Sequence, residues 1–155
     1  MNIEAKITNL SEIKLVGITH IGEFERTADI YAQLLQWAGE KGMLHDSNLR
    51  TVTIYHDNPR ITEASKVRWS ACFITDKDII PTGEIRSITI QQGKYATGHF
   101  KIEPMLIPKA WEDMCIWVKE NRYEFNDRDY FELYSNAFQL CDEQKMAVEL
   151  YIPIK

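Results

Sequence analysis

The sequence lacks a long apolar run, an apolar leader and a cluster of basic residues. Its 155 residues contain 18 Lys and Arg against 23 Asp and Glu, which gives a formal net charge of −5. Nucleic-acid binding relies on clustered basic side chains that neutralise phosphates, so direct nucleic-acid binding is not expected. No apolar stretch approaches the roughly 18 residues of a membrane span, and the first residues do not form a signal peptide. We therefore expect a cytoplasmic protein that does not enter membranes.

Disulfide, metal and nucleotide motifs are absent as well. The cysteines Cys72, Cys115 and Cys141 form no CxxC pair, and their odd number does not suit a disulfide framework. The four histidines lack metal-ligand spacings such as HxxxH; they are His20, His45, His56 and His99. GxSxG, P-loop and GxGxxG motifs do not occur. We expect neither a metal ion nor a cofactor.

The composition that remains is that of an ordinary globular domain. Apolar residues make up 45% of the chain, and 4 Trp, 7 Tyr and 6 Phe are spread along it. This length suits one domain over residues 1–155. Apolar residues recur at spacings of three and four over residues 24–38 and 107–118, which predicts two helices. Gly42 fits the end of the first helix, and Pro108 fits the start of the second.

Short runs that favour β-structure surround the two helices. They lie at residues 15–19, 51–55, 68–74, 85–90, 95–100, 130–134 and 147–152, with a weaker run at residues 3–7. Gln92-Gly93-Lys94 reads as a hairpin turn between two of these strands. Residues 57–59 and 126–129 read as loops.

The order strand-helix-strand-strand occurs twice, and some residues repeat with it. Trp37 and Trp117 are 80 positions apart, whereas Thr53-Ile54-Tyr55 precedes Glu132-Leu133-Tyr134 by 79. The difference of one residue falls in the connection after the helix. The chain is therefore expected to consist of two related units.

Two such units, at about residues 1–78 and 79–155, are expected to pack together around a pseudo-twofold axis. A small sheet covered by one helix leaves its other face bare, and that face needs a partner. Pockets commonly form where two units meet. The expected fold is α+β, with largely antiparallel sheets, two main helices and a central cleft lined by both halves.

Six segments, in order along the chain, resemble one known family. They are LVGITHIGEF at 15–24, TIYHDNP at 53–59, KVRWSAC at 66–72, GKYA at 93–96, FELY at 131–134 and ELYIPI at 149–154. These segments resemble the GyrI-like family, also known as the effector-binding domain of AraC-type regulators. The resemblance implies a duplicated strand-helix-strand-strand fold with a ligand cleft between the halves. The first turn, Gly22-Glu23-Phe24, lacks the family's proline, and Ser70 replaces an aspartate.

Glu132 is the main candidate for a site residue. Strand alternation places Glu132 and Tyr134 on one face and Phe131 and Leu133 on the other. If the apolar pair packs on a helix, the glutamate points into the cleft, where a buried carboxylate is costly unless it is paired or used. The family resemblance implies that this glutamate is the pocket acid, which complements a cationic ligand or acts as a general base. The alternative is a solvated glutamate on an edge strand.

Aromatic side chains form the second part of the expected site. Trp69, Tyr55, Tyr134 and Trp111 lie where the repeat or the family resemblance puts the cleft walls. Flat rings stack on planar ligands and attract cations. The alternative is core packing, above all for Trp111 at its helical spacing. His20 ends a strand beside the first turn, where it would either reach the cleft or serve as a structural histidine.

Three functions fit these features. The first is the binding of a small aromatic or cationic molecule by a stand-alone domain. The second, implied by the family resemblance, is hydrolysis of a strained cyclopropane-containing compound, with Glu132 activating water and Tyr134 donating a hydrogen bond. The third, also implied by the resemblance, is inhibition of DNA gyrase through protein contact. We favour binding over catalysis, and the sequence leaves the ligand and the oligomeric state open.

Overall fold

The computed structural model describes residues 4–43, 50–74, 80–135 and 145–155. The first half contains β1 (Ala5–Leu10), β2 (Ile13–Ile21), α1 (Thr27–Glu40), β3 (Arg50–Tyr55) and β4 (Arg68–Ile74). The second half contains β5 (Arg86–Ile90), β6 (Gly93–Ile102), α2 (Ile107–Glu120), β7 (Tyr130–Tyr134) and β8 (Met146–Pro153). Short 3₁₀ helices are η1 (Phe24–Arg26), η2 (Ala64–Lys66) and η3 (Pro104–Leu106). The expected boundary between the halves at residues 78 and 79, His45 and Cys141 lie outside the described residues.

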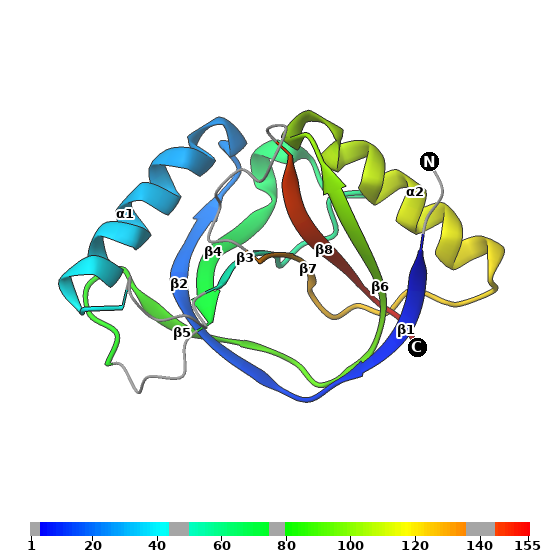
Figure 1. Ribbon diagram of the computed structural model, residues 1–155, viewed down its shortest axis with the longest axis horizontal. Coiled ribbons are helices and arrows are strands. Elements are labelled where there is room, and N and C mark those ends of the chain that lie inside the picture. Colours follow the sequence, from blue (N-terminus) through cyan, green and yellow to red (C-terminus); the bar gives the residue numbers. More distant parts are fainter. Residues whose placement is uncertain (1–3, 44–49, 75–79, 136–144) are drawn as a thin grey trace.

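The eight strands form one antiparallel sheet in the order β1-β6-β8-β7-β3-β4-β2-β5. Both helices pack on the same side of the sheet, and the links from β1 to β2 and from β5 to β6 run along the opposite side (Figure 1). Within the described residues, neither helix is long and apolar enough to cross a membrane. The expected α+β class is confirmed.

The repeat is visible in both the helices and the strands. Helix α2 begins 80 residues after α1, at 107 against 27, and ends 80 residues after it, at 120 against 40. Strands β3 and β7 pair at the middle of the sheet, with Thr53 opposite Glu132 and Thr51 opposite Tyr134. Because Thr53 and Glu132 are also 79 apart, as the repeat requires, the pseudo-twofold axis passes through this pair.

The expected hairpin at Gln92-Gly93-Lys94 is wrong. β5 and β6 follow each other closely in the chain, but β5 pairs with β2 and β6 pairs with β1 and β8. The first strand of each half thus pairs with a strand of the other half. These two strands, β1 and β5, form the two edges of the sheet. A glycine-containing link predicts a change of direction, whereas the partner of a strand is decided by the packing of the whole sheet.

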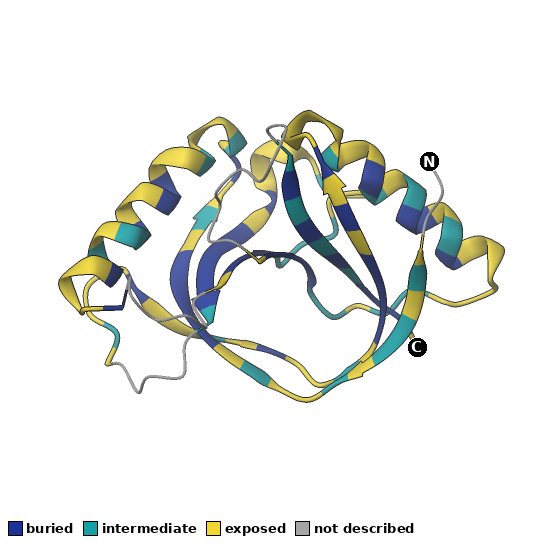
Figure 2. Ribbon diagram, in the orientation of Figure 1, coloured by how far each residue is buried: buried dark blue, intermediate teal, exposed yellow. Residues whose placement is uncertain are grey.

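The two helices bury the residues that their periodicity predicts. The buried positions are Ile30, Tyr31, Leu34 and Ala38 in α1 and Ala110, Met114, Cys115 and Val118 in α2. Figure 2 shows the buried stripe of each helix turned toward the sheet and the exposed residues turned outward. A Cβ atom at Gly98 of β6 would lie 2.5 Å from the Sδ atom of Met114, so a larger residue there would require the Met114 side chain to shift.

The two faces of the central strands carry different side chains. Phe131 and Leu133 are buried on the face away from the helices, while Glu132 and Tyr134 point to the helix side. The alternation is confirmed, but the expectation that the apolar pair packs on a helix is wrong. Strands β2, β5 and β6 curve under that face and cover it with Leu15, Ile90 and Tyr95. The cleft side of the sheet is therefore the helix side.

Candidate functional site

Glu132 lies at the centre of the molecule, in the middle of β7, with only 4% of its surface exposed. Two donors reach its Oε1 atom: the hydroxyl of Tyr55 at 2.9 Å and Nε1 of Trp111 at 2.7 Å. The hydroxyl of Tyr134 donates to Oε2. Tyr55 comes from the first half of the chain and the other two donors from the second, so both halves hold this carboxylate.

Burial and hydrogen bonding have opposite effects on this carboxyl group. Burial raises the pKa of Glu132, because a charge is less stable away from water, and the bonds from Tyr134, Trp111 and Tyr55 act to lower it. Burial, together with the nearby Glu132 charge, raises the pKa of Tyr55 and of Tyr134 well above 10. The two phenols therefore remain protonated and keep donating to the carboxylate.

A pocket of about 640 Å³ lies next to Glu132, between α2, the strands β3 and β7 and the loop after β3. Pockets of this size accommodate drug-sized organic molecules. The lining residues are Phe24, Tyr55, Pro59, Arg60, Ile107, Pro108, Trp111, Glu112, Cys115, Ile116, Lys119, Tyr130 and Glu132. The wall is thus mostly apolar and aromatic, with one buried carboxylate in it.

The aromatic rings of the pocket wall touch one another. Tyr55 and Trp111 meet edge to face, with ring centroids 6.2 Å apart and planes at 87°. The ring centroid of Phe24 lies 6.3 Å from that of Tyr55, and the ring centroid of Tyr130 lies 6.2 Å from that of Trp111. Rings that support one another in this way present a rigid surface, which favours the binding of planar or cationic groups.

Three residues expected in the cleft lie outside the pocket lining. Trp69 is fully buried, donates from Nε1 to the carbonyl of Gly22 at 2.8 Å, and stacks behind Phe24 at 5.8 Å. Tyr134 supports Glu132 without lining the pocket. His20 contacts the edge of Trp69 and lies 3.3 Å from a carboxylate oxygen of Glu23. Of the six residues expected in the cleft, Glu132, Tyr55 and Trp111 line the pocket.

The pseudo-twofold axis relates this site to a much simpler arrangement in the first half. Tyr31 is equivalent to Trp111, and Thr53 is equivalent to Glu132. The hydroxyl of Tyr31 lies 2.6 Å from Oγ1 of Thr53, and both side chains are buried. The charged group therefore occupies only one of the two equivalent positions.

The outer part of the pocket was not predicted from the sequence. Ile107, Pro108 and Cys115 lie on the same helix as Trp111, so its helical spacing was a usable signal for this wall. Arg60 lies in the loop after β3. The path of that loop brings its side chain to the pocket, and no periodic pattern in the sequence predicts such a path. Tyr130 begins β7 two residues before Glu132 and shares its face, a signal that strand alternation could have given.

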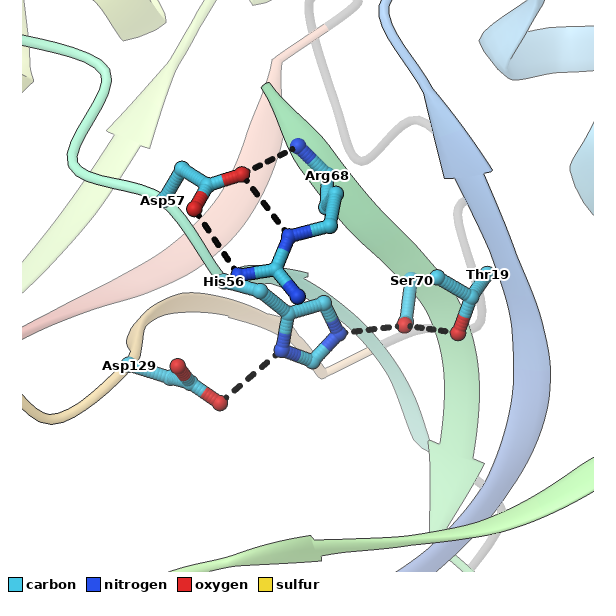
Figure 3. Close-up of polar contacts among 6 residues, drawn as sticks. All are labelled: Thr19, His56, Asp57, Arg68, Ser70 and Asp129. Carbon is cyan, nitrogen blue, oxygen red and sulfur yellow. Dashed lines mark hydrogen bonds and ion pairs between the residues drawn. The ribbon is translucent and has the colours of Figure 1, made fainter. Parts of the chain in front are cut away.

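A second polar cluster lies around Ser70 (Figure 3), whose side chain alternates with that of Trp69 along β4 and therefore points to the face away from the helices. His56 lies 3.0 Å from Oδ2 of Asp129 through Nδ1 and 2.6 Å from Oγ of Ser70 through Nε2. Ser70 in turn lies 2.8 Å from Oγ1 of Thr19. Although Asp129, His56 and Ser70 follow one another as in a catalytic triad, Ser70 is fully buried and lines no part of the pocket. The cluster instead ties β2, β4 and the segments beside β3 and β7 together.

The described residues do not form a site for a metal ion. Within them, no group of three or more His, Cys, Asp or Glu side chains gathers closely enough to hold one. The groups that line or support the pocket include a buried carboxylate, phenols and aromatic rings.

The fold and the pocket define a domain of two related halves that together enclose a site for a small molecule. The chain belongs to the GyrI-like small molecule binding domain family, whose family model matches residues 3–155. The family resemblance of the sequence is thereby confirmed. The chain is also similar to the DNA gyrase inhibitor of Citrobacter rodentium, with 24% identity over 160 residues that cover 100% of this chain and 98% of that protein.

Solved structures with the same fold include two from EcmrR and one of SAV2435. The EcmrR C-terminal domain matches with a TM-score of 0.76 at 18% identity, covering 100% of this chain and 99% of that domain. In the EcmrR–DNA complex the TM-score is 0.80 at 16% identity, and the match covers 99% of this chain but only 57% of EcmrR. SAV2435, solved bound to tetraphenylphosphonium, matches with a TM-score of 0.64 at 17% identity over 98% of this chain and 94% of that one.

Proposed function

We propose that the pocket beside Glu132 binds a small aromatic ligand that carries a positive charge. The observation that supports this most directly is the buried carboxylate in an aromatic pocket wall, held by three donors from both halves of the chain. A buried charge costs free energy, and a ligand cation would offset part of that cost. SAV2435, which has the same fold, is bound to the aromatic cation tetraphenylphosphonium in its structure.

Binding without turnover fits the surroundings of Glu132. A general base must accept a proton from water, but three donors already take up most of the roughly four acceptor positions of this carboxylate. The same bonds favour the ionised form, which is the form that attracts a cation. Tyr55 and Trp111 add ring faces or edges against which the ligand would pack.

Titration with tetraphenylphosphonium, followed by tryptophan fluorescence, tests this function. Trp111 lines the pocket, so its emission should change when the ligand binds. In Glu132→Gln, which keeps the size of the side chain and removes its charge, the affinity should fall by about tenfold or more. Thr53→Val, at the equivalent position of the first half, is the matched control and should bind like the wild type. An unchanged affinity in Glu132→Gln would contradict the proposal.

Inhibition of DNA gyrase by protein contact is a second candidate, supported by the similarity over the whole chain to a DNA gyrase inhibitor. Inhibition of gyrase requires the protein to be in the cytoplasm, because gyrase acts there on the chromosome. A supercoiling assay with purified gyrase tests it. Loss of supercoiling as the protein is added would support inhibition, and unchanged supercoiling at a large excess of protein would remove it.

A further inference from the structure

The outer part of the pocket carries positive charge as well. Arg60 and Lys119 line the pocket that also contains Glu132. Within the residues that the structure describes, neither of these two basic side chains forms an ion pair. The guanidinium of Arg60 lies 4.8 Å from the ring centroid of Phe125, which holds it near the pocket.

Tyr130 adds a buried donor to the same region. It lines the pocket and is only 4% exposed, and its hydroxyl makes no close hydrogen bond within the described residues, although the Arg60 side chain interacts with it. Buried hydroxyl groups in folded proteins normally have a partner, because an unsatisfied one is costly. Burial raises the pKa of Tyr130 to about 12, and the charge of Arg60 acts against this rise, so the hydroxyl stays protonated beside a cation.

The basic residues and the phenol lie close together. Arg60, Lys119 and Tyr130 line the same pocket, as does Cys115. Burial raises the pKa of the Cys115 thiol, and the positive charges of Arg60 and Lys119 act to lower it. Glu112 also lines this region. Its side chain is exposed, as are those of Arg60 and Lys119, so water screens all three charges, and the two positive charges outnumber the negative one. A phenol donor with two unpaired cations nearby is suited to an anionic oxygen, such as a carboxylate.

We propose that the ligand carries two charged groups of opposite sign. A cationic, planar aromatic part packs near Glu132, and a carboxylate or similar anionic group accepts a hydrogen bond from Tyr130 beside Arg60 and Lys119. This inference depends on the proposed function, because it requires that the pocket binds a ligand. It adds that the pocket selects an amphoteric ligand over one that carries only a positive charge.

Rhodamine B and its ethyl ester provide a direct test of this selectivity. The two dyes share the same cationic ring system and differ only in whether the carboxylate is free or esterified. Fluorescence titration of the whole protein should show that rhodamine B binds about tenfold more tightly than its ester. Tyr130→Phe and Arg60→Gln should remove most of this preference, while Arg86→Gln, a charge change on the edge strand β5, should leave it intact.

The outcomes separate the inference from the function on which it depends. Equal affinities for the two dyes, or tighter binding of the ester, would overturn the amphoteric ligand and leave the cation site in place. If neither dye binds, both the inference and the proposed function fail. Tyr130→Phe removes a hydroxyl that makes no close hydrogen bond within the described residues, so it should fold about as well as the wild type.

Discussion

The two halves of the molecule provide a comparison within one chain. They share the order of their elements, and their helices are displaced by the same 80 residues at both ends. At the equivalent central positions, however, the first half has the neutral pair Tyr31 and Thr53, and the second has Trp111 and Glu132. A change at two equivalent positions thus distinguishes a neutral contact from a charged site on the same scaffold.

The charged position also draws on the first half. Tyr55, at the end of β3, donates to Glu132 across the junction of the two halves. Neither half alone would hold the carboxylate with three donors. Duplication therefore provides the frame and the junction of the two halves, while divergence at a few positions provides the charged site.

The largest expected effects come from replacing two tryptophans, one in the core and one in the pocket wall. Trp69→Ala should lower the free energy of unfolding by about 3–5 kcal/mol, because it leaves a cavity in a fully buried core. Trp111→Ala should cost less stability, because Trp111 is only partly buried, but it should abolish ligand binding. Urea denaturation and dye titration measure the two effects. Equal losses of stability in the two variants would show that Trp111 is a core residue as well.

The next effect concerns the neutral contact of the first half. Thr53→Val removes the hydroxyl that lies 2.6 Å from that of Tyr31, so the free energy of unfolding should fall by about 1 kcal/mol. Thr53→Ser keeps the hydroxyl and serves as the control for that bond. Ligand affinity should remain unchanged in both variants. If Thr53→Val weakens binding as strongly as Glu132→Gln, the two halves would share one site and the comparison would fail.

The smallest expected effect is a dependence of stability on pH. Burial raises the folded-state pKa of Glu132 above its ordinary value of 4.5, so the folded protein keeps a proton that the unfolded chain has already lost. This contribution to stability is therefore present at low pH and is lost as the pH rises from about 4.5 through the folded-state pKa. Urea denaturation of the wild type and of Glu132→Gln over a pH series measures this effect. The free energy of unfolding of the wild type minus that of the variant should fall as the pH rises. A constant difference would mean that the carboxyl group titrates as it does in the unfolded chain.

Much of the fold was predictable from local patterns. The spacing of apolar residues located both helices, and strands β4 and β7 have the predicted bounds, 68–74 and 130–134. The partners of β5 and β6 were not predictable in this way, because these two strands pair in opposite parts of the sheet instead of forming the expected hairpin at residues 92–94. Pairing at that range depends on the packing of the whole chain and leaves no trace in a short segment.

The candidate site was predictable in its centre and less so at its edges. Alternation along β7 and the family resemblance identified Glu132, and the repeat drew attention to Trp111. Trp69 was placed in the cleft, although its ring lies behind Phe24 in the core. Large aromatic residues look alike in a sequence whether they line a pocket or fill a core, and only the packing around them distinguishes the two.

A crystal structure of the protein with tetraphenylphosphonium bound tests the central claim most directly. The ligand should lie in the pocket beside Glu132, with its rings against Tyr55 and Trp111, and Tyr31 and Thr53 should remain in contact with each other. A ligand bound at the Tyr31–Thr53 pair, or on the outer surface away from Glu132, would contradict the assignment of the site to the charged half.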